Sequence, residues 1–310
     1  MPPASQRIVV VGGLNMDIVI RLERLPGPGE TIGGGELFQA AGGKGANQAV
    51  AAARLGAAVA MVGRIGRDAF GRELRRSLRA EGIDTRALRA IDARTGVAAI
   101  VLDRHGENSI AVASGANTLL RPTDLPRRLL ARADVVLTQL ESPLDTVEAA
   151  LLAARAGGAH TVLNAAPAAD LSRSLLGAAD VVIVNEHELA TLLGRAVAPG
   201  QEGSAALTLR AFPDQVAVVT LGERGALAVT PAGVVEQPAF PVSVVDTTGA
   251  GDAFVAAFSY AYWPARDLPA TLRFACAAGA LATTRPGAQP SLPTAREVAE
   301  LLSQAGAPDA

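Results

Sequence analysis

Residues 181–193 have the sequence VVIVNEHELATLL, in which four β-branched apolar residues are followed by a polar turn and an amphipathic stretch. Val181–Val184 predicts a buried strand and Glu186–Leu193 a helix. The same unit recurs along the chain, and such alternation predicts an α/β fold with a doubly wound, mostly parallel sheet flanked by helices. The further strands are predicted at Ile8–Val11, Val59–Val62, Val135–Leu137, Thr161–Leu163 and Val216–Thr220, and the further helices at Gly45–Leu55, Gly71–Glu81, Leu144–Arg155, Ala253–Tyr262, Leu268–Thr283 and Thr294–Gln304.

Two segments depart from this alternation. Ile18–Gln39 and Thr95–Ala113 alternate polar with apolar residues around Gly, Pro and Asn turns, which predicts half-exposed antiparallel strands. Because they follow early strands, we expect about residues 15–41 and 95–115 to form a small β-sheet lid over the crevice where open α/β sheets bind ligands. With no internal repeat or long linker, residues 1–310 are predicted to form a single domain.

Composition limits the possible partners and location. The 310 residues carry a net charge of −2 with both signs scattered along the chain, which argues against nucleic acid or an anionic membrane as a partner. The single cysteine, Cys276, cannot form an internal disulfide, and the opening residues MPPASQR include no apolar secretion signal. No uninterrupted apolar run reaches the length of a membrane span. We therefore expect a cytoplasmic protein.

The strongest motif is Val245-Asp-Thr-Thr-Gly-Ala-Gly-Asp252, which leads directly into a predicted helix. The small residues Gly249, Ala250 and Gly251 would let backbone N–H groups approach an anion, and the helix dipole adds positive potential there. Asp252 could then accept the proton of a substrate hydroxyl while the amides hold a transferring phosphoryl group. Asp252 could instead simply cap the helix, although Asp246 and the two threonines favour the functional interpretation.

A second motif, Ala41-Gly-Gly-Lys-Gly-Ala-Asn47, superficially resembles a phosphate-binding P-loop. It is not one, because Phe38 and Gly45 occupy the positions that require Gly and Ser or Thr. Gly43 and its neighbour Gly42 would instead let the backbone pass close to a small ligand, with Lys44 and Asn47 donating to its oxygens. The alternative is a flexible loop with a solvated lysine.

Other polar residues follow predicted strands. Asn15 and Asp17 lie two residues apart and would point to the same side of an extended backbone, where one carboxylate can accept from both hydroxyls of a vicinal diol. Glu141 could add another hydroxyl acceptor at the carboxyl edge of the sheet. Alternatively, the first two belong to an ordinary turn and Glu141 is an acid in a first helical turn.

The segment Asn185-Glu-His-Glu188 has the spacing of a helix capping box. Its functional interpretation puts Asn185 beside nucleotide phosphates and Glu188 near a water-coordinated Mg²⁺. The turn Thr220–Gly225 could cradle a nucleotide by its backbone. The three histidines have no zinc-ligand spacing with the cysteine, so no zinc site is predicted.

Taken together, these motifs resemble the ribokinase-like sugar kinase family, the pfkB-type carbohydrate kinases, from Val9 to about Ser291. Gly42–Asn47 is similar to the amino-terminal signature of the family and Asp246–Asp252 to its carboxyl-terminal signature. Segments Asn15–Asp17, Gln139–Pro143, Asn164–Pro167 and Gly287–Ser291 are similar to those of its ribose-phosphorylating members. The resemblance implies transfer of the γ-phosphoryl group of ATP to the 5-hydroxyl of D-ribose, with Asp252 as catalytic base.

The resemblance also implies a set of ligand contacts. The sugar would lie among Asn15, Asp17, Gly43, Lys44, Gly45, Ala46, Asn47, Glu141 and Asp252. ATP would contact Asn185, Thr220, Leu221, Gly222, Glu223, Arg224, Gly225, Gly251 and Cys276. An activating potassium ion would lie among Asp246, Thr248, Ala282, Arg285, Gly287 and Ser291, and Mg²⁺ would be held through water by Glu188.

The chain departs from the family pattern at three positions, and the resemblance also implies an oligomeric state. Cys276 stands where members often carry a histidine against the adenine, and Thr283 and Pro286 alter the potassium loop. In the family the lid is also the dimer interface. An isolated flap is only marginally stable, so a homodimer is expected.

Several alternatives stay open. A nucleoside kinase of the same fold would need stacking surface in the lid, where Phe38 is the only aromatic residue of the two predicted segments. A phosphosugar kinase would need more cations than Lys44 near the sugar. Fructose or another small sugar remains possible as substrate. A catalytically silent sugar sensor is disfavoured by Asp252, and a Rossmann dehydrogenase by the incomplete glycine fingerprint after Gly12-Gly13.

Overall fold

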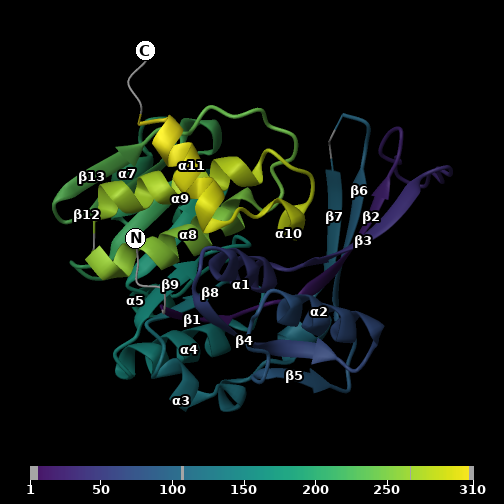
Figure 1. Cartoon of the computed structure of the whole chain (residues 1–310), viewed down its shortest axis with the longest axis horizontal. Coiled ribbons are helices and arrows are strands. Elements are labelled where there is room, and N and C mark those ends of the chain that lie inside the picture. The colour runs from purple at the N-terminus through teal and green to yellow at the C-terminus, as the bar shows by residue number, and fades with distance from the viewer. Residues whose placement is uncertain (1–5, 106–107, 266, 307–310) are drawn as a thin grey trace.

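The computed structural model describes residues 6–105, 108–265 and 267–306. Its main feature is a nine-stranded sheet in the order β13-β12-β11-β10-β9-β8-β1-β4-β5, beside a four-stranded sheet in the order β3-β2-β6-β7 (Figure 1). The strands are β1 Arg7–Val11, β2 Asn15–Arg21, β3 Glu36–Gly42, β4 Ala58–Gly66, β5 Leu88–Ile91, β6 Gly96–Leu102, β7 Asn108–Ala113, β8 Val135–Thr138, β9 His160–Asn164, β10 Val181–Asn185, β11 Val216–Thr220, β12 Ala226–Thr230 and β13 Gly233–Gln237.

The main sheet is parallel from β5 to β11, and β12 and β13 add an antiparallel edge. The chain starts at β1 in the middle, extends to β4 and β5 on one side, and then returns to β8 on the other. The strand order therefore reverses between β1 and β8. The carboxyl edge at such a reversal is where open α/β sheets bind ligands.

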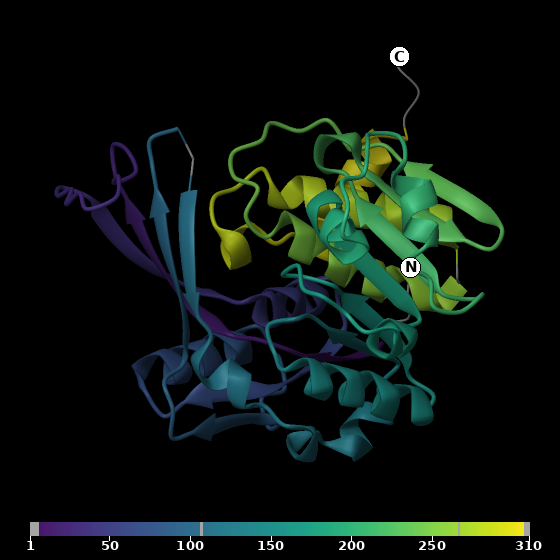
Figure 2. The same cartoon turned by 180° about the vertical axis from the view of Figure 1, so that it is seen from behind.

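Helices cover both faces of the main sheet (Figures 1 and 2). Alternate residues of β1 face opposite cores, with Ile8 and Val10 in one and Val9 and Val11 in the other. The first core contains side chains of α1, α2, α8, α9 and α11, and cores on the opposite face contain those of α3 to α7. The helices are α1 Lys44–Arg54, α2 Ala69–Ala80, α3 Arg127–Leu130, α4 Leu144–Ala156, α5 Arg173–Gly177, α6 Glu186–Leu193, α7 Glu202–Leu207, α8 Ala250–Ala265, α9 Leu268–Ala282, α10 Ala288–Ser291 and α11 Ala295–Gln304.

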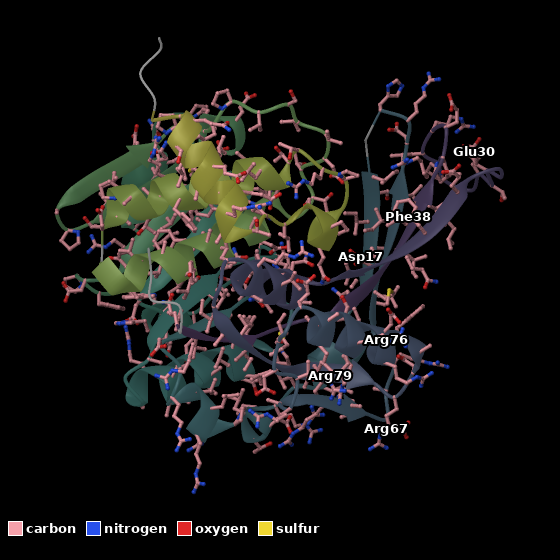
Figure 3. The ribbon with its side chains drawn as sticks, viewed as in Figure 1. Asp17, Glu30, Phe38, Arg67, Arg76 and Arg79 are labelled. Atoms are coloured by element: carbon pink, nitrogen blue, oxygen red, sulfur yellow. The ribbon has the colours of Figure 1, made fainter. Side chains whose placement is uncertain are left out.

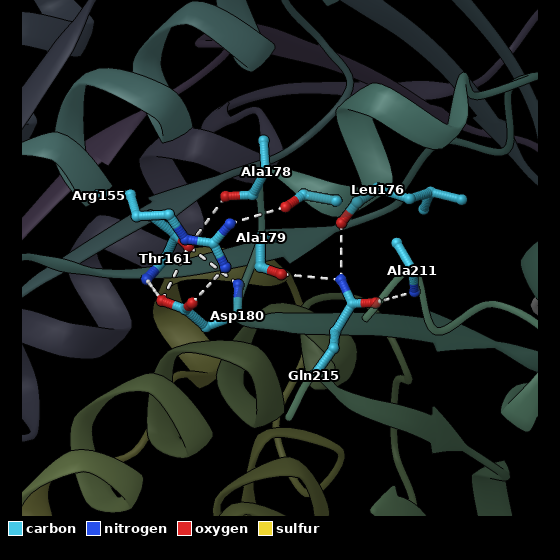
Figure 4. Close-up of polar contacts among 9 residues, drawn as sticks. Arg155, Thr161, Leu176, Ala178, Ala179, Asp180, Ala211 and Gln215 are labelled. Carbon is cyan, nitrogen blue, oxygen red and sulfur yellow. Dashed lines mark hydrogen bonds and ion pairs between the residues drawn. The ribbon is translucent and has the colours of Figure 1, made fainter. Parts of the chain in front are cut away.

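A polar network fixes the amino edge of the main sheet (Figure 4). The Asp180 carboxylate accepts from Arg155 Nη2 at 2.6 Å, from the Thr161 backbone N–H at 2.8 Å and from Thr161 Oγ1 at 3.0 Å. Gln215, fully buried, donates to the carbonyls of Leu176 at 2.6 Å and Ala179 at 2.8 Å. Because these polar groups satisfy one another, the network holds the loops that enter β9, β10 and β11.

The small sheet, β3, β2, β6 and β7, projects from the main body beside α10 (Figures 1 and 2). Its outer pairs are antiparallel as predicted, but β2 and β6 pair in parallel, so an entirely antiparallel flap was wrong. Both strands follow parallel strands of the main sheet, β1 and β5, and leave its carboxyl edge in the same direction. Residues 106 and 107 of the second predicted segment, and 1–5 of the predicted signal-free start, lie outside the described residues.

The α/β prediction is confirmed, and each predicted strand and helix of the main body is present with its bounds shifted by a few residues. The predicted helix Ala253–Tyr262 begins earlier, at Ala250, because the glycine motif forms its first turn. Short or weakly apolar elements such as β5, β13 and α5 were not predicted. No helix in the described ranges is long and apolar enough to cross a membrane.

Candidate active site

Asp252 lies in the first turn of α8 at the carboxyl edge of the main sheet, and only 8% of its surface is exposed. Its Oδ2 accepts from Asn47 Nδ2 at 2.9 Å and its Oδ1 from Gln48 Nε2 at 2.9 Å, both from the start of α1. Residues more than 200 positions apart thus meet at one carboxylate. The two amides fix its plane, so it faces the site in a defined orientation.

Gln48 is a functional candidate that the sequence prediction missed. It is fully buried, donates to Asn164 Oδ1 at 2.9 Å as well as to Asp252, and accepts from Gln139. It therefore connects α1, α8 and the ends of β8 and β9. Its position in the sequence could have revealed it. A glutamine in the otherwise Ala-rich buried face of α1 needs polar partners.

Acidic residues gather around Lys44 at the base of the small sheet. Glu141 accepts from the Lys44 backbone N–H at 2.8 Å and from Asn15 Nδ2 at 3.4 Å. Burial, together with the neighbouring carboxylates of Glu141 and Asp252, raises the pKa of Asp17 to about 7. Burial likewise raises the pKa of Glu141.

Lys44 is the positive group in this cluster. Burial alone would lower its pKa, but the charges of Asp252, Glu141 and Glu188 outweigh that effect and raise it. The ammonium is therefore charged at neutral pH. It faces several carboxylates, an arrangement that leaves hydrogen-bond acceptors available to a ligand rich in hydroxyls.

The glycines of the Gly42–Asn47 motif make room for this cluster. A Cβ on Gly42 would lie 2.2 Å from Asp17 Oδ2, and a Cβ on Gly43, whose φ is +89°, would lie 2.7 Å from the Asn15 backbone nitrogen. Neither position tolerates a larger residue. The close approach is thus to Asn15 and Asp17 of β2. Asn117, also missed from the sequence, donates to Asn15 Oδ1 at 2.9 Å and holds that side chain.

A cavity of about 250 Å³ opens beside Asp252. It joins the Gly42–Asn47 motif, the Asp246–Asp252 motif and the ends of β10 and β11. Its lining residues are Lys44, Asn164, Ala166, Ile183, Val184, Asn185, Glu188, Thr220, Thr247, Gly249, Gly251, Asp252 and Val255.

The three residues of the predicted anion hole differ in their surroundings. Gly249 has a φ of +83°, which turns the chain into α8. The Ala250 N–H donates to the Thr247 carbonyl at 3.2 Å, whereas a Cβ on Gly251 would meet nothing within 4 Å. Gly251 and the start of α8 therefore face open space, where the positive end of the helix dipole favours an anion.

At the other end of the cavity, Asn185 and Glu188 form the predicted capping box. Asn185 Oδ1 accepts from the Glu188 N–H at 2.7 Å, and Glu188 Oε2 accepts from the Asn185 N–H at 2.8 Å. Both also line the cavity, so capping and ligand contact are compatible. Burial raises the pKa of Glu188.

The predicted nucleotide turn is only partly at the cavity. Thr220 lines it, while Gly222, Glu223 and Arg224 form a short 3₁₀ turn flanked by Leu221 and Gly225. Arg224 donates to Glu186 and Glu202, each at 2.6 Å, so its guanidinium is committed within the protein.

Cys276 lies on α9 outside that cavity. Its side chain is buried, Sγ is 3.9 Å from the Gln237 carbonyl, and burial raises its pKa to about 12. The thiol is therefore protonated at physiological pH and packs as a small apolar group.

The six residues predicted around potassium lie on adjoining segments. Asp246 accepts from the Thr248 N–H and hydroxyl at 2.9 and 2.6 Å and from the Gly287 N–H at 2.7 Å. Ala282 ends α9 and Ser291 ends α10, both buried, and the Arg285 side chain forms an ion pair with Glu297. Within the described ranges, no group of three or more His, Cys, Asp or Glu residues could hold a metal ion.

A buried carboxylate beside a helix amino terminus can accept the proton of a hydroxyl next to a bound phosphoryl group, as a phosphotransferase acting on an alcohol group requires. The model of the pfkB family carbohydrate kinase matches residues 5–295, and the chain belongs to this family. The predicted family is therefore confirmed.

Individual relatives within this family are named for their sugar substrates. The chain is 40% identical to a ribokinase of Haemophilus influenzae over 96% of this chain and 99% of the relative, and 36% identical to a deoxyribokinase of Salmonella typhi over 96% and 98%. Among solved structures, Arabidopsis thaliana ribokinase complexed with ribose and ATP superposes with a TM-score of 0.88 at 34% identity, covering 97% of this chain and 98% of that one.

Proposed function

We propose that the chain phosphorylates the 5-hydroxyl of D-ribose with ATP, giving ribose 5-phosphate and ADP. The observation that carries the proposal is the cavity in which Asp252 and Lys44 meet Gly251, Asn185 and Thr220. It joins a hydroxyl-accepting side to a phosphate-accepting side. The similarity to ribokinases and to a ribokinase complexed with ribose and ATP supports ribose as the sugar.

Asp252 is the proposed catalytic base. Its carboxylate, oriented by Asn47 and Gln48, accepts the proton of the 5-hydroxyl as that oxygen bonds to the γ-phosphorus and the bond from phosphorus to the ADP oxygen breaks. The N–H groups of Gly249 and Gly251, and that of Ala250 once it leaves the Thr247 carbonyl, form the proposed anion hole for the transferring phosphoryl group.

The proposed sugar site lies where β2 meets α1. Asp17 and Glu141 accept from the sugar hydroxyls, and Asn15, Lys44 and Asn47 donate or accept beside them. The backbone of Gly43, Gly45 and Ala46 closes this side of the site. A vicinal diol suits Asp17 because one carboxylate accepts from both hydroxyls, and ionisation of Asp17 with a pKa of about 7 would strengthen that contact.

The nucleotide is proposed to extend from Gly251 past Asn185 and Thr220 along the backbone of residues 221–225. The chemistry of Glu188 fits a water-mediated Mg²⁺: it is a buried carboxylate at the cavity that can be ionised by a nearby cation. The ion would neutralise phosphate charge when bound. Cys276 remains a proposed adenine-side residue that would contribute apolar packing only.

The loops of the Asp246 network also fit a monovalent cation. Asp246 draws residues 246–248 toward Gly287, and the Arg285 guanidinium is turned to Glu297, so backbone carbonyls and one carboxylate can face the ion without that positive charge. We propose potassium there, held by Asp246, Thr248, Ala282, Arg285, Gly287 and Ser291. Activity should be higher in potassium than in sodium buffer at equal ionic strength; equal rates would contradict this site.

We propose that the small sheet is the lid of a single domain and pairs with its copy in a homodimer. One of its faces exposes Phe38 (41%), Ile110 (54%) and Val112 (56%), apolar side chains that pairing would cover. Sedimentation measurements should give a dimer, and Val112→Lys together with Ile110→Lys should give monomer. A monomeric parent chain would contradict the interface. The single cysteine fits the proposed cytoplasmic location.

The deciding experiment measures ADP formation with ribose, deoxyribose, ribulose, fructose, adenosine and fructose 6-phosphate in the presence of Mg²⁺ and potassium. We expect ribose to have the highest kcat/KM, and deoxyribose to be at least about tenfold poorer because it leaves a buried acceptor unpaired. A preference for adenosine or for a phosphosugar would overturn the substrate and keep the mechanism. No turnover with any of them would favour a sugar sensor.

A further inference from the structure

A second cavity, of about 520 Å³, shares no lining residue with the one at Asp252. It lies between α2 and the β4–β5 side of the main sheet, and Ile65 and Ala90 form part of its wall. Its remaining lining consists of two glycines and the arginines Arg67, Arg72, Arg75, Arg76 and Arg79, with no carboxylate among the described lining residues.

The spacing along α2 concentrates this charge. Positions 72, 75, 76 and 79 are separated by three and four residues, so their side chains lie on one face of the helix. Arg67 joins them from the turn between β4 and α2. Figure 3 shows Arg67, Arg76 and Arg79 on this part of the molecule, away from Asp17 at the base of the small sheet.

Two of these guanidiniums are held by hydrogen bonds to other parts of the protein. Arg75 Nη2 donates to the Leu88 carbonyl at 2.6 Å and Arg79 Nε to Thr85 Oγ1 at 2.9 Å, which holds both against β5 and the loop before it. Burial lowers the pKa of Arg75, and the nearby charge of Arg79 lowers it further. The protein therefore holds like charges close together, which costs free energy in the absence of an anion.

Counter-charges within the protein do not neutralise the cavity. Arg76 pairs with Glu73, while Arg67 and Arg72 make no side-chain hydrogen bond or ion pair with any described residue. The nearest acids of the same segment are engaged elsewhere. Asp68 accepts from Gly71 and Thr95, and Glu81 pairs with Arg54.

We propose that this cavity binds a small anion that carries two phosphoryl groups. Five arginine side chains border the cavity, and their charges less that of Glu73 leave about four positive charges, which two phosphoryl groups of about −1.5 to −2 each would balance. The planar fork of arginine matches phosphate oxygens, and the volume falls in the range of small-molecule sites. A long polyanion would instead need an extended charged surface.

Hydrogen bonds connect this cavity to the residues around the proposed sugar site. Asp68 accepts from the Thr95 N–H and hydroxyl, and the next residue, Gly96, lies in register with Asn15. Separately, Ser77 of α2 contacts Gln289 at 3.4 Å, and Gln289 donates to Asn47 at 3.3 Å. A ligand that tightens α2 is therefore expected to change the KM for the sugar.

The test titrates the full chain with inorganic pyrophosphate while sugar and a non-hydrolysable ATP analogue saturate the active site. We expect one binding event per chain, weakened by added salt and at least about tenfold weaker in Arg67→Gln/Arg72→Gln, which removes two charges with no structural partner. The matched control is Arg132→Gln/Arg195→Gln, which removes two exposed arginines remote in sequence and should bind pyrophosphate within about twofold of the parent.

Unchanged binding in Arg67→Gln/Arg72→Gln, equal loss in the control, or no binding by the parent would overturn the proposal. Thermal unfolding without pyrophosphate should show the same Tm for both variants, which separates loss of the site from loss of the fold. Binding of RNA or of anionic vesicles that pyrophosphate cannot displace would also overturn it, in favour of a charged surface. An unchanged sugar KM at saturating pyrophosphate would contradict the coupling to Asn15 and Asn47.

Discussion

The two edges of the main sheet use similar residues in opposite ways. At the amino edge, Asp180 is paired with Arg155 and further bonded to Thr161. At the carboxyl edge, Asp17, Glu141 and Asp252 crowd around Lys44, and burial raises the pKa of the first two. A satisfied network stabilises the fold, whereas an under-neutralised one stores unfavourable energy that a bound ligand can relieve. The contrast predicts that substitutions at the two edges affect different quantities.

The largest effect is expected from Asp252→Asn. The amide cannot accept the substrate proton, so kcat should fall by about 10³-fold or more while sugar and ATP binding persist. Turnover measurements and calorimetric titration separate the two quantities. A kcat within tenfold of the parent would exclude Asp252 as the base.

The second-largest effect on kcat is expected from Gln48→Leu. It removes one of the two amides that orient Asp252 and leaves Asn164 without a donor, while keeping a similar volume. We expect a roughly 10- to 100-fold lower kcat with little change in sugar KM, because the interaction acts on the base rather than on the sugar. Gln48→Met, which keeps a similar shape but loses the donor without adding a charge beside Asp252, should resemble it. A loss confined to KM would contradict the positioning role.

Asp17 should make both the stability of the fold and the sugar KM depend on pH. Its pKa of about 7 in the folded chain against 3.8 ordinarily means that, between these values, the folded state keeps a proton that the unfolded state has lost. Its contribution to stability therefore falls as pH rises through this window. Asp17→Asn should accordingly raise Tm at pH 8 by a few degrees and raise the sugar KM by about tenfold or more.

The same variant gives a pH test. In the parent chain, sugar KM should rise as pH falls from 8 to 6, since Asp17 becomes protonated and loses an acceptor. That rise should be absent in Asp17→Asn. A parallel pH dependence in both proteins would show that another group titrates.

The smallest effect on activity is expected from Asp180→Asn. Loss of the partly exposed ion pair with Arg155 should cost about 1–2 kcal/mol and lower Tm by a few degrees, with kcat and KM unchanged. Urea unfolding and steady-state kinetics measure both. A change in kcat without loss of stability would mean that the two edges are not separate.

Sequence patterns sufficed where local rules decide the outcome. Runs such as Val181–Val184 are apolar enough to predict burial, and the glycine turn before Asp252 followed by an apolar stretch predicts the start of a helix, so the main sheet and the site motifs were predictable. The parallel β2–β6 pairing was not, because register between distant strands depends on where both leave the main sheet.

The residues that position site side chains, Gln48 and Asn117, were not predicted for the same reason. Gln48 and Asn117 act through partners 204 and 102 positions away, and neither belongs to a motif with a recognisable spacing. The cluster at Arg67 and Arg72–Arg79 was hidden by a nearly neutral total charge, which averages over local concentrations of one sign.

Asn15 and Asp17 belong to β2 itself rather than to a loop beneath it. A strand of the small sheet therefore carries part of the proposed sugar contacts, and any swing of that sheet would move these residues with it. Capture of the sugar and closure over it would then be one event, and release of the phosphorylated sugar would wait for reopening. Pulse-chase trapping of labelled ribose should show a slow off-rate set by this motion, independent of the nucleotide's own affinity.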